Sequence, residues 1–211
     1  MRRVKQGASV SGSPMSPERK LLVAAAAAVA AVAAFAGAAG AASPSATPTA
    51  TVSGQVTVNG APFRGGAIRF GSLVNILSGT ITLKTGVGTL EVHGVPYIPA
   101  AFVLRFTHVN GEPYVQLQLA KGNFAACPKR TTASARASTK IVRSLWGDGK
   151  GNFQTSGRFA AATVRGTMWQ TDDRCDGTWL RVVRGVVVMT DFKTGKNTTV
   201  RAGHTHLVLA K

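Results

Sequence analysis

A pair of acidic side chains is one common source of acid–base catalysis, and this chain carries few acidic residues. Its 211 residues include 8 Asp and Glu against 25 Lys and Arg. Catalysis of this kind needs two carboxylates held in different environments. The densest acidic cluster surrounds Cys175 and consists of Asp172, Asp173 and Asp176. This spacing is typical of a solvated loop pinned by a disulfide, so we expect no catalytic residues and no enzyme.

Histidines offer a second kind of chemistry, because imidazole binds Zn²⁺ and Cu²⁺. Alternate residues of a strand point to the same side, so His204 and His206 would share one face. A metal site there needs a third ligand, for which His93 and His108 are the candidates. Two isolated histidines are more often simply polar surface, and we expect no bound metal.

The segment from Asp148 to Asn152 superficially resembles a calcium-binding loop. Lys150, however, stands where an oxygen ligand is required, and no Glu closes the loop. The sequence also lacks a glycine-rich phosphate loop and an ordered Ser-His-Asp set. We therefore expect no cofactor.

The only two cysteines, Cys127 and Cys175, form an even pair. Such a pair usually forms a bridge in an oxidising compartment. Closing a loop of about 50 residues would stabilise the fold by about 4 kcal/mol in the chain-entropy model. Two free buried thiols are the alternative. We expect the disulfide, because the N-terminal sequence indicates export.

Aromatic and basic side chains alternate in the C-terminal half, which makes this region the best candidate for binding. Trp and Arg are over-represented among the residues that dominate binding energy. The alternative is that the aromatic rings face the core while the arginines point outward into solvent. The candidate binding face consists of Trp146, Arg165, Trp169, Trp179 and Arg181.

The elements that must position these residues are strands. Short alternating segments recur every 8–12 residues, which is typical of sandwiches, rolls and barrels. Asn59-Gly60 and Asn110-Gly111 are strong hairpin turns, and the glycine-rich stretch 148–152 predicts another turn. The fold class expected is all-β: an antiparallel β-roll or sandwich-like single domain that follows an N-terminal signal helix.

The N-terminus carries an export signal. Basic residues precede the apolar run Leu21–Ala39, and small residues follow it, as in a secretory signal peptide. Residues 1–42 are therefore predicted to be the signal, 43–53 a Ser/Thr/Pro linker and 54–211 the β-domain. The run is also long enough to span a bilayer, so an uncleaved membrane anchor stays open as the alternative.

Three segments carry a family resemblance. They are Ala162–Thr167, with Trp169 soon after, then Arg184–Val188 and Thr199–Gly203. Their A-T-V-R-G-T, R-G-V-V-V and T-V-R-A-G letters resemble the FecR-type extracytoplasmic domain, and Leu145–Phe153 resembles its secreted actinobacterial form. The resemblance implies a β-domain outside the cytoplasm that binds a ligand or a protein. FecR regulators have a cytoplasmic domain before their membrane span, whereas only 20 residues precede the apolar run here, so the anti-sigma role is not expected.

The net charge of the chain indicates which classes of binding partner to expect. Five of the 25 basic residues and one of the 8 acidic residues precede the apolar run, so the remainder carries a net charge of +13. Such an excess attracts anionic partners, but the charges are dispersed and no RNA-binding motif accompanies them.

We expect a secreted or surface-attached, non-catalytic FecR-like β-domain that binds a protein, a wall polymer or a ligand. The alternative is a membrane-anchored extracytoplasmic sensor or regulator of a signalling pathway. The expected partners are an unknown protein or an anionic cell-envelope polymer. Nucleic acid is disfavoured, and a membrane is a partner only if residues 21–39 stay uncleaved.

Overall fold

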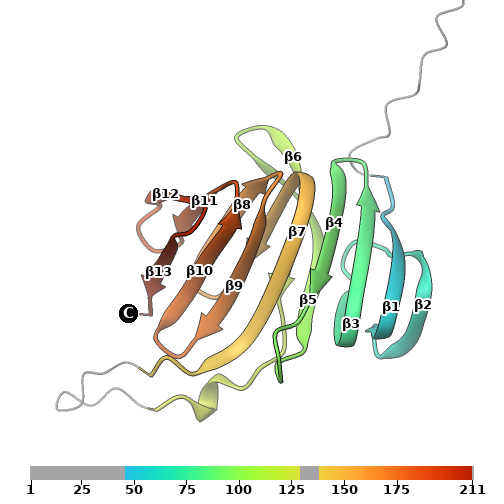
Figure 1. Ribbon diagram of the computed structural model, residues 1–211, viewed down its shortest axis with the longest axis horizontal. Helices are drawn as coiled ribbons and strands as arrows, with labels where there is room; N and C mark the ends of the chain where they lie inside the picture. Colours follow the sequence, from blue (N-terminus) through green and yellow to red (C-terminus); the bar gives the residue numbers. More distant parts are fainter. Residues whose placement is uncertain (1–45, 129–137, 211) are drawn as a thin grey trace, which may run out of the picture. The chain divides into compact units, whose positions relative to one another are not determined.

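The computed structural model describes residues 46–128 and 138–210, and these form an all-β domain (Figure 1), as predicted. The predicted signal segment 1–42 lies outside the described residues. Within the described part, no helix has the length and apolarity needed to cross a membrane. The strands are β1 (Thr49–Val58), β2 (Ala61–Ala67), β3 (Leu73–Thr85), β4 (Gly88–His93), β5 (Ala100–Val109), β6 (Glu112–Leu119), β7 (Ile141–Ser156), β8 (Ala160–Arg165), β9 (Met168–Arg174), β10 (Gly177–Arg184), β11 (Val186–Asp191), β12 (Asn197–Arg201) and β13 (Thr205–Leu209).

The strands form two layers. The front layer follows the pairing order β13-β10-β9-β7-β4-β3, and the back layer follows β12-β11-β8-β7-β6-β5-β3 (Figure 1). Strands β3 and β7 belong to both layers, and β1 pairs with β3 along its whole length. The arrangement is the sandwich expected from the alternation. One pairing differs from the antiparallel expectation: β6 runs parallel to β7.

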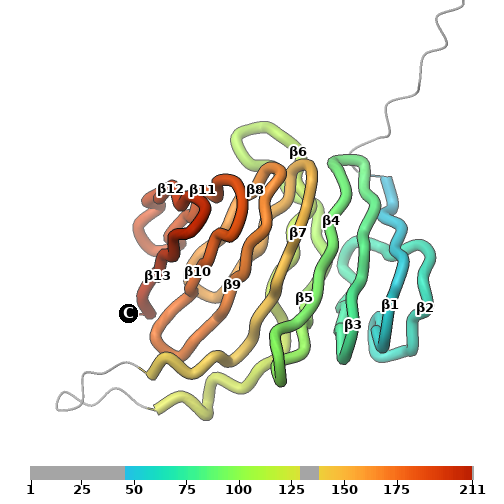
Figure 2. Tube along the Cα trace, viewed as in Figure 1, coloured from blue at the N-terminus to red at the C-terminus, as the bar shows by residue number. Residues whose placement is uncertain are grey.

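The long strand β7 turns from one layer into the other, as Figure 2 shows. Its first half pairs with β9, and its second half pairs with β8 and β6. The turn predicted at residues 148–152 is therefore wrong, because these residues continue the strand. The bend depends on Gly151, which has a φ of 117° and lies opposite Gly88 of β4. Without a side chain, each glycine lets the other backbone approach closely.

A second glycine pair bends β1 and β3 together. Gly54 lies opposite Gly79, with φ angles of 98° and 78°. A Cβ atom on Gly79 would lie 1.9 Å from the carbonyl oxygen of Ser53, so only glycine fits there. At this point β3 leaves β5 in the back layer and begins to pair with β4 in the front layer. The two glycine pairs are the corners of the sandwich.

Side chains from both layers meet in one apolar core. Trp169, Phe102 and Phe153 are the largest residues with almost no exposed surface, and burial of each is worth about 1.5–3 kcal/mol. The indole nitrogen of Trp169 donates a hydrogen bond of 3.0 Å to the Thr155 hydroxyl. Its ring lies against Gly147, where a Cβ would come within 2.7 Å of it.

The two Asn-Gly turns predicted from the sequence are confirmed, whereas the predicted boundary between the linker and the β-domain is wrong. Asn59-Gly60 and Asn110-Gly111 both have two successive positive φ angles, which match the type I′ hairpin turns expected of Asn-Gly. Strand β1, however, begins at Thr49. Five residues assigned to the 43–53 linker therefore belong to the sheet, because pairing with β2 and β3 overrides their linker-like composition.

Candidate binding face

The five residues of the predicted binding face do not lie together. Trp146, Trp179 and Arg181 lie on the outer face of the front layer, with at least part of their surface accessible to solvent. Trp169 is buried in the core. Arg165 lies on β8 in the back layer, where its Nε donates a hydrogen bond of 3.0 Å to the Tyr114 hydroxyl. The prediction is therefore wrong for Trp169 and Arg165, because the alternation of β9 points Trp169 inward and β8 belongs to the other layer.

The strand register places Trp146, Trp179 and Arg181 next to two further residues on the same face of the sheet. Trp146 of β7 lies opposite Gln170 of β9, which lies opposite Arg181 of β10. One step along the strands, Asp172 lies opposite Trp179. Directly opposed residues of antiparallel strands point to the same side of a sheet. We name these five residues, Trp146, Gln170, Asp172, Trp179 and Arg181, the front strip.

The front strip continues onto β4. His93 lies opposite Trp146, and the two rings stack with centroids 5.7 Å apart and planes 23° apart. Beyond His93, the 94–99 loop borders an open hollow of about 680 Å³ that Glu91 and His93 also line. Tyr97 is fully exposed on this loop with a φ of 66°, a conformation that is uncommon for a residue other than glycine.

Asp172 is the unusual member of the front strip, because it is a carboxylate with 1% of its surface exposed. Its Oδ1 accepts hydrogen bonds from the Ser144 hydroxyl and, at 3.0 Å, from the Gln170 amide nitrogen. Oδ2 accepts from the same nitrogen at 3.0 Å. Within the part of the chain that the structure describes, no cation forms an ion pair with it. Burial raises the pKa of the Asp172 carboxyl above its ordinary value of 3.8, and the two hydrogen bonds only partly oppose this.

Replacing Asp172 by asparagine should stabilise the fold at neutral pH. Because the pKa is raised, the folded state holds the proton more tightly than the unfolded state, and ionisation above pH 3.8 costs stability. An uncharged amide avoids this cost. We expect Asp172→Asn to unfold at a higher urea concentration than the native protein at pH 7, with a difference that vanishes as the pH falls below 3.8. A lower midpoint at pH 7 would contradict the argument.

The other two acidic residues near Cys175 form buried hydrogen bonds and ion pairs that stabilise the fold. Asp173 and Asp176 are both buried, so the prediction of a solvated loop is wrong. Asp173 accepts hydrogen bonds from the Arg143 side chain and the Arg158 backbone, and Asp176 forms a two-bond ion pair with Arg174. Burial and pairing follow from the register of β9 and β10, which the sequence does not reveal.

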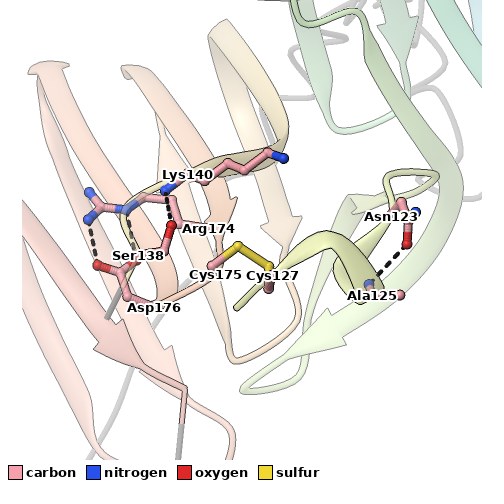
Figure 3. Close-up of a disulfide and its surroundings, with 8 residues drawn as sticks. All are labelled: Asn123, Ala125, Cys127, Ser138, Lys140, Arg174, Cys175 and Asp176. Carbon is pink, nitrogen blue, oxygen red and sulfur yellow. Dashed lines mark hydrogen bonds and ion pairs between the residues drawn. A yellow bond between two sulfur atoms is a disulfide. The ribbon is translucent and has the colours of Figure 1, made fainter. Parts of the chain in front are cut away.

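The predicted disulfide between Cys127 and Cys175 is confirmed, with Cα atoms 5.4 Å apart (Figure 3). It joins the segment that follows β6 in the back layer to the turn between β9 and β10 in the front layer. The Arg174–Asp176 ion pair lies beside it, as Figure 3 also shows. The bridge therefore links the two layers covalently at the end of the sheet where β9 turns into β10.

The histidines considered as metal ligands are not brought together. His204 precedes β13 and lies in a turn, where its Nδ1 is 3.1 Å from the Ala202 carbonyl oxygen. His206 lies opposite Leu180 of β10. His93 belongs to the front layer and His108 to the back layer. Among residues 46–128 and 138–210, no three His, Cys, Asp or Glu side chains are grouped as a metal site would need.

Sequence reasoning missed Gln170, Asp172 and His93 as members of this surface. Gln170 and Asp172 alternate with Trp169 along β9, so a strand signal for residues 168–174 would have placed them opposite the core side. Their neighbours on β7 and β10 follow only from the register. Comparison with family models, curated proteins and solved structures gives no match to this chain.

Proposed function

We propose that this protein is an exported, non-catalytic binding domain of FecR-like type, and that the front strip is its binding surface. The observation that carries the proposal is the front strip itself. Two partly exposed tryptophans and an exposed arginine share one outer face, although Trp169 shows that this fold can bury a tryptophan completely. Aromatic rings and arginines are the side chains that contribute most binding energy per residue.

One observation supports the export. A disulfide between the only two cysteines suits an oxidising compartment outside the cytoplasm. The three segments that resemble FecR-type domains fall largely in β8, β11 and β12, which are neighbours in the back layer. Segments that are separate in sequence thus lie side by side in one part of the sheet.

The binding proposal is tested by sedimenting the purified protein with cell envelopes isolated from the organism that produces it. We expect the native protein to sediment with the envelopes and a Trp146→Ala/Trp179→Ala variant to bind at least tenfold more weakly. Arg165→Ala is the matched control, because it removes a large side chain from the opposite outer face. Equal binding of all three proteins would exclude the front strip as the binding surface.

The export proposal is tested by N-terminal sequencing of the protein recovered from the medium and from the membrane fraction. Cleavage after Ala42 or Ala46 in the medium fraction is the expected result. An intact apolar run, found only in membranes, would instead establish the anchored sensor.

A further inference from the structure

We propose that the front strip binds an extended glycan, with the two tryptophans as stacking platforms and Gln170 as the hydroxyl-binding group between them. This inference rests on the proposed function, because it names the class of ligand that the same surface takes. A sugar ring offers apolar C–H faces and a rim of hydroxyl groups. It is therefore recognised by flat aromatic rings together with fixed polar groups that donate or accept hydrogen bonds.

The spacing of the tryptophans fits a chain of several sugar units. Trp146 and Trp179 are separated by two interstrand steps of about 4.8 Å and one step of about 6.7 Å along the strand. Their Cα atoms are therefore about 12 Å apart, measured diagonally across β7, β9 and β10. The span is that of a short oligosaccharide rather than a single sugar, so one ligand can contact both rings.

Gln170 lies between the two tryptophans. Its side chain is held in one orientation by Asp172, two residues along the same strand. Its amide nitrogen donates to both oxygens of the buried Asp172 carboxylate, at 3.0 Å each. A carboxylate only accepts hydrogen bonds, so it fixes which end of the amide faces it. The Gln170 carbonyl oxygen, which has no hydrogen-bond partner in the described residues, is left to accept a hydroxyl from a ligand. Asp172 is thus a positioning residue.

Arg181 supplies a donor at the other end of the row. Three arginines of the described structure form ion pairs: Arg143 with Asp173, Arg174 with Asp176 and Arg184 with Asp148. Arg181 lies beside Gln170, is exposed, and forms no ion pair in the part that the structure describes. A guanidinium binds carboxylates through two parallel hydrogen bonds, so Arg181 favours a glycan that carries acidic groups.

A fixed, partly polar surface distinguishes a glycan site from a protein-docking surface. The buried charge of Asp172 costs stability, because burial raises the pKa of its carboxyl. In exchange, the Asp172 carboxylate holds the Gln170 amide in a fixed orientation on the outer face of the sheet. A protein interface gains most from desolvated apolar pockets at its centre, whereas the centre of the front strip is polar, with Gln170 and Asp172.

The test is a titration of the purified full-length protein with three hexasaccharides: chitohexaose, xylohexaose and a galacturonic acid hexamer. Tryptophan fluorescence reports binding directly, because two of the three tryptophans lie in the front strip. We expect a saturable change with the galacturonic acid hexamer, and a loss of affinity of at least tenfold for Trp146→Ala and for Trp179→Ala. Trp146→Phe keeps an aromatic platform and should retain most of the affinity. Arg165→Ala, on the opposite face, should bind normally.

Asp172→Asn separates positioning from folding. Asparagine keeps one acceptor oxygen and replaces the other by a donor, so the Gln170 amide nitrogen loses one of its two acceptors and is held less firmly in its orientation. We expect about tenfold weaker glycan binding from a variant that is at least as stable as the native protein. A purely structural role for Asp172 would leave the affinity unchanged.

The outcomes separate this inference from the proposed function. No change of fluorescence with any of the three hexasaccharides overturns the glycan assignment. If envelope binding still depends on Trp146 and Trp179 in that case, the binding function stands and its ligand belongs to another chemical class. If envelope binding is also independent of both tryptophans, the proposed function fails together with the inference.

Discussion

Replacing Gly79 or Gly151 by alanine should prevent the domain from folding. A Cβ on Gly79 would lie 1.9 Å from the Ser53 carbonyl oxygen, and one on Gly151 would lie 2.0 Å from the Val87 carbonyl oxygen. Both obstacles are backbone atoms, Ser53 in β1 and Val87 in the turn that precedes β4, so neither can move without disturbing the corner of the sandwich. We expect a loss above about 4 kcal/mol, which is an exceptional cost for one substitution and comparable to the whole stability of a small domain.

Gly60→Ala is the matched control for the corner glycines. Gly60 also has a positive φ, of 88°, but nothing lies within 4 Å of the position of its Cβ. Its replacement should therefore cost only about 1 kcal/mol, from the strained φ angle alone. The measurement is the urea concentration at half-unfolding, together with the yield of soluble protein. Similar losses for Gly60→Ala and Gly79→Ala would show that close backbone approach is not what forms the corners.

Asp173→Ala should be the most damaging change among the acidic residues. Asp173 is fully buried and accepts hydrogen bonds from the Arg143 Nε at 2.7 Å, from the Arg158 backbone nitrogen at 2.8 and 2.9 Å, and from the Thr178 hydroxyl. Its removal leaves these donors unpaired and a partly buried guanidinium without its counter-charge. We expect a loss of about 3–5 kcal/mol, measured by urea unfolding.

Asp148→Ala provides the comparison for Asp173→Ala. Asp148 also pairs with an arginine, Arg184, but the two side chains are 34% and 56% exposed. Exposed ion pairs contribute about 0–1 kcal/mol, so this variant should unfold near the native midpoint. If both variants lost the same stability, burial would not be the source of the Asp173 effect.

The sequence predicts the fold class because its signals are local. Alternation, the two Asn-Gly turns and the even cysteine pair each depend on a few neighbouring residues, and the structure confirms all three. The bend in β7 was mistaken for a turn for the same reason. Glycines at 149 and 151 have the composition of a loop, and their role appears only when β4 lies against them.

The front strip was only partly predictable, because it depends on register. Tryptophan and arginine composition identified Trp146, Trp179 and Arg181, but the same composition also selected Trp169, which the alternation of β9 turns into the core. Gln170 and Asp172 carry no compositional signal. They become recognisable only when β7 and β10 are placed on either side of β9.

The strands shared by the two layers impose an order on how this chain reaches its folded state. Strand β7, residues 141–156, is the partner of β4 and β9 in one layer and of β6 and β8 in the other. A chain that emerges from a ribosome or an export channel N-terminus first presents β1 to β6 before that partner exists. Their apolar faces stay exposed to solvent until the C-terminal half is available. Partly folded intermediates with exposed apolar surface are prone to aggregate. Neither layer can therefore be completed until residues 141–156 have emerged.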